Sequence, residues 1–406
     1  MNAGDLPLSD VSVLDFGQAI AGPICATFLA DLGADVVKVE RPTGDVYRIN
    51  RREKDGVGFN PPFEVYNRNK RGLSLDVKSD EGLDIVYDLV EKTDIVVQNW
   101  PPGVAEKLGL DYDTLAERNP DLVYVHVSGY GEEGPAANQP AMDSIVQHVS
   151  GFASTLGYEG DPPIRSQSSV ADFYAGYNAA LSALAALRDA ERGNGGQKVD
   201  ISMLQSTMHA ADGAFEYHLN TGEEIPRGGR NNFALPDMLY GAAEATDGWV
   251  AVALLVYSDR IFEAFCELVG REDLLEEPRY DDDAERMADS AKFTAIFEEW
   301  LAEQTVDEAL EQLREHNIPA ARHNTISEAV QLEHNKATNA FVDVDHPRLG
   351  SVRLTDTPLS LSHAEPTIRS HAPLRGEDNE SVLREAGYDD AEIEALREAG
   401  ILSADE

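Results

Sequence analysis

The sequence contains few cysteines, no zinc-type histidine pairs and no long apolar segment. Its two cysteines, Cys25 and Cys266, lie far apart in apolar surroundings, so we expect buried thiols and neither a disulfide nor a metal site. The ten histidines show no paired spacing of the zinc type. A run of about 18 apolar residues is absent, and we expect no signal peptide. These absences favour a cytoplasmic protein that binds no membrane.

Positive charge is also scarce. The chain carries 33 lysines and arginines against 74 aspartates and glutamates, a formal net charge of −41. Lysine is especially rare, and the acidic residues are spread along the chain. A dispersed acidic surface keeps a protein hydrated where salt screens its self-repulsion, which indicates a salt-loving source. An acidic tail or metal-buffering protein would need a local acidic block, and nucleic-acid binding is disfavoured at this charge.

The length of 406 residues predicts two domains. At the N-terminus, a strand at 11–16, a helix ending near Leu32 and a strand at 34–40 form a βαβ unit. This order predicts a parallel, Rossmann-like sheet. Gly17 and Gly22 do not complete the GxGxxG dinucleotide fingerprint, so a nicotinamide dehydrogenase is disfavoured.

A smaller α+β domain is predicted in the centre of the chain. Two strands around Asp247-Gly248 read as a hairpin, and helical patterns follow it. We therefore divide the chain into a large Rossmann-like domain from both ends, a small α+β domain and two linkers. The boundaries are 1–204 and 348–406 for the large domain, 227–324 for the small domain, and 205–226 and 325–347 for the linkers.

Asp172 stands immediately before a helical stretch rich in alanine and leucine, 173–190, which we expect to be buried. At this position the free backbone N–H groups and the helix dipole hold a carboxylate ionised. Asp172 is therefore either a structural cap, the commoner case for such residues, or a nucleophile held in a fixed pose. The local pattern alone favours the cap.

The segment 38–78 inverts the charge of the chain, with ten basic and six acidic residues, a local net of 10 − 6 = +4. These cations either pair with acidic residues or form a site for a phosphate-rich ligand.

Trp100, at a predicted strand end, could stack on an adenine ring or pack into the core. The glycines of 227–232 permit close approach to a ligand, or form a plain turn.

The order of these motifs resembles the family III CoA-transferases, the CaiB/BaiF group that includes formyl-CoA transferase. The resemblance covers nearly the whole chain and rests on Ala21-Gly22-Pro23, the segment 29–42, Asn69-Lys70-Arg71, Ser128-Gly129-Tyr130-Gly131, Asp172 and the segment 196–200. It implies a homodimer of two interlocked subunits, with the linkers as the crossings between them. It also raises the nucleophile interpretation of Asp172 above that of the cap.

The resemblance implies an acyl-CoA:carboxylate CoA-transferase that works through an aspartyl-CoA thioester on Asp172. CoA thioesters are then substrates, and we expect no permanently bound cofactor and no metal. The matching CoA-binding positions are Gln18, Ile20, Ala21, Arg41, Lys78, Asn99, Trp100 and Lys107. Trp100 replaces a common phenylalanine, and Lys107 replaces a common arginine and so loses bidentate geometry. Gly228 and Gly229 resemble the glycine loop that covers the site.

The salt-adapted composition adds an expectation about the substrates, because salt-loving archaea with a methylaspartate route transfer CoA from succinyl-CoA to mesaconate. The far carboxylate of such an acceptor needs a cation, for which Arg165, Arg227 and Arg230 are candidates.

Two alternatives remain open. Acyl-CoA racemases of the same fold need a histidine thirty residues before the aspartate, where this chain has Met142 beside Asp143. A thioether cannot move a proton, so racemisation is disfavoured. The other alternative is a regulator that binds CoA without catalysis.

Overall fold

The computed structural model describes residues 6–49, 52–54, 56–231 and 237–404. The chain forms two compact units. One contains both chain ends, up to Ser150 and from His334 onward, together with Gln167–Ala210. The other consists of Gly151–Ser166 and Ala211–Glu333. No helix of the described residues has both the length and the apolar character needed to cross a membrane.

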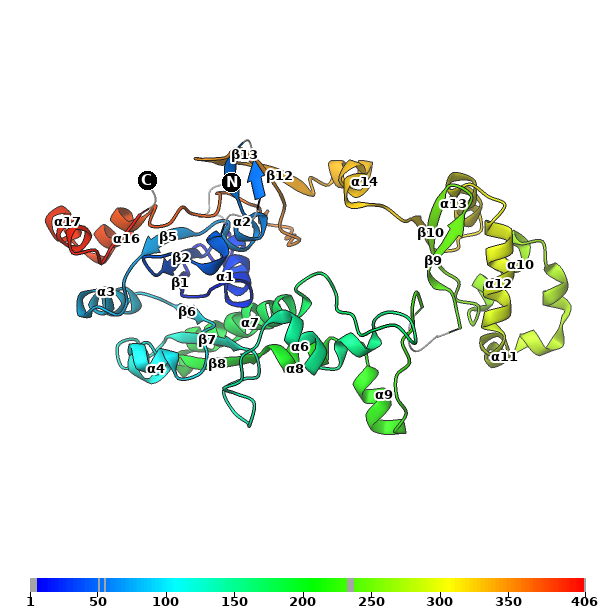
Figure 1. The fold of residues 1–406 in the computed structure, drawn as a ribbon, viewed down its shortest axis with the longest axis horizontal. Helices are drawn as coiled ribbons and strands as arrows, with labels where there is room; N and C mark the ends of the chain where they lie inside the picture. The colour runs from blue at the N-terminus through cyan, green and yellow to red at the C-terminus, as the bar shows by residue number, and fades with distance from the viewer. Residues whose placement is uncertain (1–5, 50–51, 55, 232–236, 405–406) are drawn as a thin grey trace. The chain divides into compact units, whose positions relative to one another are not determined.

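The unit with the chain ends contains a six-stranded sheet in the order β5-β2-β1-β6-β7-β8 (Figure 1). Every neighbouring pair in it is parallel, which confirms the predicted sheet. The strands are β1 (Ser12–Asp15), β2 (Asp35–Glu40), β5 (Arg71–Ser74), β6 (Ile95–Gln98), β7 (Val123–Ser128) and β8 (Gln197–Ser202).

Alternate residues of these strands face opposite sides of the sheet, as the pleat requires. Val13 joins a core with α1 (Ala21–Asp31) and α7 (Val170–Asp189). Its neighbour Leu14 joins a second core with α3 (Asp80–Val90), α16 (Asn379–Ala386) and α17 (Asp390–Glu398). Helices therefore cover both faces, and the C-terminal segment completes the layer on one of them.

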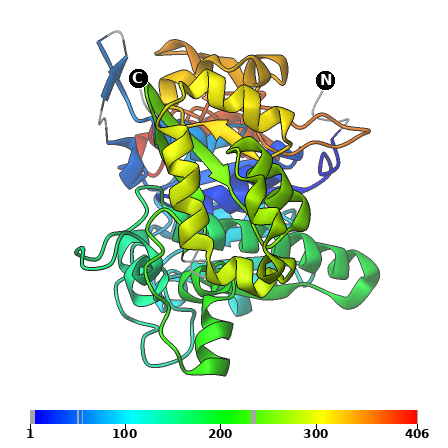
Figure 2. The same ribbon diagram turned by 90° about the vertical axis from the view of Figure 1, so that its right-hand side faces the viewer.

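The central unit is built on the predicted hairpin. Strands β9 (Tyr240–Ala245) and β10 (Gly248–Ala253) pair antiparallel, and β11 (Ala320–Arg322) pairs with β10. The helices facing the viewer in Figure 2 pack on this sheet around a core that includes Phe265, Phe293 and Phe297. They are α10 (Asp259–Leu268), α12 (Ser290–Leu301) and α13 (Val306–Glu315).

The segments predicted as linkers carry regular structure. Segment 205–226 includes most of α8 (Met203–His209) and all of α9 (Ala214–Thr221). Segment 325–347 includes α14 (Ile326–Gln331), α15 (Glu333–Ala337) and β12 (Phe341–His346), which pairs with β13 (Gly350–Thr355). Residues 151–166, assigned above to the large domain, group with the central unit.

The basic segment 38–78 is tied into the fold by ion pairs. Lys38 Nζ lies 2.9 Å from Asp45 Oδ2, and Lys70 Nζ lies 2.7 Å from Asp15 Oδ2, with all four side chains fully buried. The other pairs are Arg48 with Glu40, Arg68 with Asp31, and Arg71 with Asp35. These five cations therefore form the ion pairs that the sequence left as one of two interpretations.

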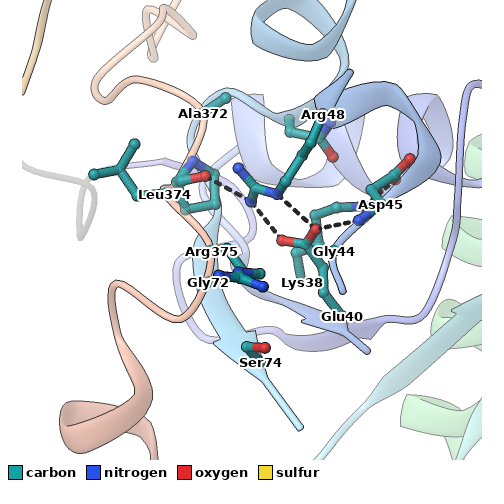
Figure 3. Close-up of polar contacts among 12 residues, drawn as sticks. Lys38, Glu40, Gly44, Asp45, Arg48, Gly72, Ser74, Ala372, Leu374 and Arg375 are labelled. Carbon is teal, nitrogen blue, oxygen red and sulfur yellow. Dashed lines mark hydrogen bonds and ion pairs between the residues drawn. The ribbon is translucent and has the colours of Figure 1, made fainter. Parts of the chain in front are cut away.

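Lys38 connects strand β2 to the loop that follows β1. Its Nζ also donates to the carbonyl oxygen of Gly17 at 2.9 Å. Burial lowers the pKa of Lys38, but the charges of Asp45 and Asp15 raise it by more, so the net shift is upward. Figure 3 shows Asp45 next to Glu40, which accepts from the Asp45 N–H and from Arg48.

We predict that Lys38→Met destabilises the protein by about 3–5 kcal/mol, because it leaves the buried Asp45 carboxylate without its cation. The matched control is Arg353→Met, which removes an exposed pair with Asp343 and is expected to change stability little. Denaturant unfolding at constant salt measures both. Equal losses in the two variants would contradict the importance of the buried pair.

Candidate active site

Asp172 lies in the first turn of α7, two residues after Val170, and Ser169 is the N-cap. The aspartate is therefore inside the helix rather than at its cap. Burial, followed by the charge of Asp143, raises the pKa of Asp172 from 3.8 to about 7. A carboxylate with this pKa is a stronger base than an ordinary aspartate, yet about half of it is ionised at neutral pH.

Asp143 is the acidic neighbour of Asp172 and begins α6 (Asp143–Val149). Its Oδ1 accepts from the backbone N–H of Ala171 at 2.9 Å, and its Oδ2 accepts from Gln147 Nε2 at 2.7 Å. Asp143 thus holds the first turn of α7 in place and also adds a negative charge next to Asp172. Met142, beside it, is 71% exposed, and its thioether cannot transfer a proton.

Tyr66, from α2 (Pro61–Asn67), is a neighbour of Asp172 that the sequence did not reveal. Its ring packs edge-on against Phe173, with 5.8 Å between centroids. Burial, followed by Tyr47 and then the charge of Asp172, raises the pKa of Tyr66 to about 12. The phenol therefore remains protonated and can act as a hydrogen-bond donor in this region.

The loop between β1 and α1 brings together two predicted CoA-binding positions that are far apart in sequence. Asn99 Oδ1 accepts from the Gln18 N–H, and Asn99 Nδ2 donates to the Gln18 carbonyl, both at 2.8 Å. Ala19 adopts a left-handed conformation with φ of 61°, which costs a non-glycine residue energy and is enriched at functional sites. A Cβ at Gly22 would lie 3.2 Å from the Asn99 side chain, so glycine permits this close approach.

The remaining predicted CoA positions follow the carboxyl ends of neighbouring parallel strands, where α/β proteins bind ligands. Arg41 follows β2 and donates to the Gly44 carbonyl, Lys78 follows β5, and Lys107 lies on α4 (Val104–Leu108) after β6. All three side chains are exposed. Ile20 and Ala21 form the start of α1 and are buried.

Trp100 packs into the core on one side. Its ring lies 5.4 Å from that of Phe16 and joins the core formed with α3 and α16. The residue stays partly exposed, so packing in the core does not exclude stacking on a ligand.

The central unit holds the predicted substrate residues. Arg230 forms an ion pair with Glu298 at 2.5 Å, and Arg227 donates to the carbonyls of Tyr158 and Asp161. Arg165 donates to the Ser166 carbonyl.

The predicted glycine loop forms a turn in the same unit. The carbonyl of Gly228 accepts from the Asn231 N–H at 2.8 Å, and the Gly229 N–H donates to the carbonyl of Gly157 at 3.1 Å. A Cβ at Gly229 would lie 2.6 Å from the Tyr158 ring, so this position requires glycine. Asn232, the last residue of this motif, lies outside the described residues.

Comparison with known proteins identifies the family. A model of CoA-transferase family III matches residues 8–379. The chain belongs to CoA-transferase family III. A succinyl-CoA:mesaconate CoA-transferase of Haloarcula hispanica is 34% identical over 389 residues, which cover 94% of this chain and 96% of the relative. A formyl-CoA:oxalate CoA-transferase of Streptomyces avermitilis is 31% identical over 97% of this chain and 99% of its own.

A solved structure supports the same assignment. A CaiB/BaiF family protein from Brucella suis matches with a TM-score of 0.81 and 27% identity, over 94% of this chain and 99% of the other. This family III enzyme thus has the expected α/β fold, and CoA thioesters are the substrates of such transferases.

The raised pKa of Asp172 predicts a cost in stability that depends on pH. Between pH 3.8 and about 7 the unfolded chain has lost this proton while the folded protein keeps it, so the contribution of Asp172 to stability falls as pH rises and levels off above 7. Asp172→Asn avoids this loss. We therefore compare the free energy of unfolding of Asp172→Asn with that of wild type at two pH values. We expect this difference, variant minus wild type, to be about 1–2 kcal/mol larger at pH 8 than at pH 5.5.

Denaturant unfolding at the two pH values measures this difference, and Asp84→Asn, on the exposed side of α3, is the control. A gain that does not change with pH would show that Asp172 is ionised normally in the folded protein.

Proposed function

We propose that this family III enzyme transfers CoA from an acyl-CoA, succinyl-CoA, to a dicarboxylate acceptor such as mesaconate, with Asp172 as nucleophile. The observation that carries the proposal is the position of Asp172. Its carboxylate lies in the first turn of α7, where burial and Asp143 make it basic. The unit that contains Asp172 also contains all of the predicted CoA-binding residues. These residues follow the carboxyl ends of strands in its sheet.

The reaction proceeds by four carboxylate or thiolate attacks. Asp172 attacks the thioester carbonyl, the C–S bond breaks, and a mixed anhydride and CoA thiolate form. The thiolate attacks the aspartyl carbonyl, releasing succinate and leaving aspartyl-CoA. The acceptor carboxylate then attacks this thioester, and the released thiolate attacks the acceptor acyl carbon, which regenerates Asp172. No net proton is transferred, so the site needs a nucleophile and oxyanion donors but no general base.

The described residues suit these steps. A basic carboxylate attacks more readily than an ordinary one, and a pKa of about 7 leaves part of Asp172 ionised at neutral pH. The protonated Tyr66 supplies a donor, and the positive end of the α7 dipole a favourable field, for the charge that develops on oxygen.

The proposal for the substrates rests on the relative from Haloarcula hispanica, which is named for succinyl-CoA and mesaconate, and on the acidic composition argued above. Arg165 and Arg227 remain candidates for the far carboxylate of the acceptor. Arg230 is the weaker candidate because Glu298 already neutralises it.

We further propose that the enzyme is a cytoplasmic, interlocked homodimer adapted to salt. Large apolar side chains on α6, α7 and α8, three helices that contact one another, are exposed in the single chain: Ile145, Val149, Tyr177, Leu181 and Met208, together with Met142 just before α6. A second subunit would cover them, because soluble proteins rarely leave such clusters in water. Sedimentation velocity in high salt would find a dimer, and a monomer would contradict this part of the proposal.

The test is an assay of CoA transfer in about 2–3 M KCl, where salt screens the net charge of the enzyme. The products are separated by chromatography. With succinyl-CoA and mesaconate we expect mesaconyl-CoA and succinate in equal amounts, and Asp172→Ala should lower the rate by at least about 10³-fold. Asp84→Ala is the control. Activity that is unchanged in Asp172→Ala, or exchange of the acyl Cα proton without CoA transfer, would contradict the proposal and favour the regulator or the racemase.

A further inference from the structure

A charged cluster that the reaction above does not use lies along the neighbouring strands β7 and β8. His126 of β7 is 1% exposed. Its Nδ1 lies 3.0 Å from Glu132 Oε1 and 3.1 Å from Asp200 Oδ1, while Lys198 Nζ lies 2.5 Å from Glu132 Oε2. Strands β7 and β8 and the loop after β7 each contribute to this cluster. Its histidine was not singled out in the sequence, because its partners come from distant segments.

Both ring nitrogens of His126 face groups that only accept hydrogen bonds. The Nε2 lies 3.0 Å from the carbonyl oxygen of Trp100, which cannot donate. The Nδ1 faces two carboxylates, which accept but do not donate when ionised. Burial raises the pKa of Asp200, but hydrogen bonds from His126 and the Glu132 N–H lower it by more, so this carboxylate is ionised. All these neighbours are satisfied together only when both nitrogens carry protons.

Charge balance favours a proton over a metal ion. The ligand atoms of His126, Glu132 and Asp200 lie within 4.8 Å of one another, a spacing that would also suit a metal. However, Lys198 already neutralises one carboxylate, and an imidazolium neutralises the other. A divalent cation beside neutral His126 would give these four side chains and the ion a net charge of about +1, whereas a proton on His126 leaves the cluster neutral.

The cluster reaches the predicted CoA site through the backbone of Trp100. Its carbonyl accepts from His126, and its N–H donates to Gln98 Oε1 at 2.7 Å. The preceding residue, Asn99, forms the reciprocal amide pair with Gln18. A chain of hydrogen bonds thus links His126 to Trp100 and to the loop that contains Gln18.

We infer that His126 is an imidazolium that positions Trp100 for binding of the CoA thioester. This inference rests on the proposed function. His126 touches no reacting atom, so it is a positioning residue: it acts on the affinity for the thioester and leaves the chemical step at Asp172 unchanged. The other titratable groups lining the small cavity on this side of the ring are Glu106, Asp111, Tyr112 and Tyr124, which are neutral or acidic and so favour the cation.

The first test needs no substrate. In protein with ¹⁵N-labelled histidine at pH 7.5 and high salt, we expect one ring with protons on both nitrogens, and this signal should be missing in His126→Gln. A neutral ring at His126 would overturn the inference. So would a shift of its Nδ1 signal on addition of one equivalent of Zn²⁺, which would assign a metal site instead.

The second test separates positioning from a purely structural role. We expect His126→Gln to raise KM for the acyl-CoA about tenfold, the effect of losing one charge-assisted hydrogen bond, with kcat changed less than about twofold. His316→Gln, just after the end of α13, is the control. An unchanged KM, or equal losses in KM and kcat, would overturn the inference.

A third measurement distinguishes failure of the inference from failure of the proposed function. In a Trp249→Phe, Trp300→Phe background, fluorescence reports Trp100 alone, and we expect His126→Gln to shift its emission. If wild type transfers no CoA, the proposed function fails, while the ring protonation and this emission still decide whether His126 positions Trp100. An unshifted emission would overturn that role.

Discussion

The site depends on the buried ammonium group of Lys38. It joins three elements at once, since it lies on β2, pairs with Asp45 and donates to the carbonyl of Gly17. Removing two charges from water is costly, and such a pair offsets this cost only where additional hydrogen bonds complete its geometry. Asp45 meets this condition, because its other oxygen accepts from the N–H groups of Tyr47 and Ala19.

A second buried pair supports the same loop. Lys70 Nζ binds Asp15 at the end of β1 and donates to the carbonyl of Pro23 at the start of α1. Burial, the largest influence, lowers the pKa of Lys70 to about 8 despite the nearby Asp15. The strained conformation of Ala19 is thus maintained by ion pairs at both ends of the loop. A purely apolar core could not hold a polar backbone segment in this conformation, because its N–H and C=O groups would lack partners.

Asp172 shows the opposite electrostatic arrangement. Among the described residues, no cation forms an ion pair with it, and burial, followed by the charge of Asp143, raises its pKa. The raised pKa lowers the free energy of unfolding at neutral pH, and it also makes the carboxylate more basic. Such a trade-off between stability and function is common at active sites. The same Asp143 binds the N–H of Ala171, so one residue holds the helix start and adds to the raised pKa of Asp172.

The sequence predicted the features of the fold that short stretches of the chain determine by themselves. The strand–helix–strand order indicated the parallel sheet, the Asp247-Gly248 turn marked the hairpin, and the alanine-rich period located the helix that contains Asp172. The expectation that this helix is wholly buried was wrong for the single chain, since Leu181 is 69% exposed. Tyr66 and the partners of Lys38 and His126 could not be predicted, because their contacts join segments whose proximity only the fold creates.

The most direct test of the account is mass spectrometry of the enzyme after incubation with succinyl-CoA in high salt and trapping with hydroxylamine. The account predicts one modified peptide, with the hydroxamate on Asp172, and its loss when mesaconate is added before the trap. An unmodified Asp172 in an enzyme that still transfers CoA, or a modification on another carboxylate, would contradict it.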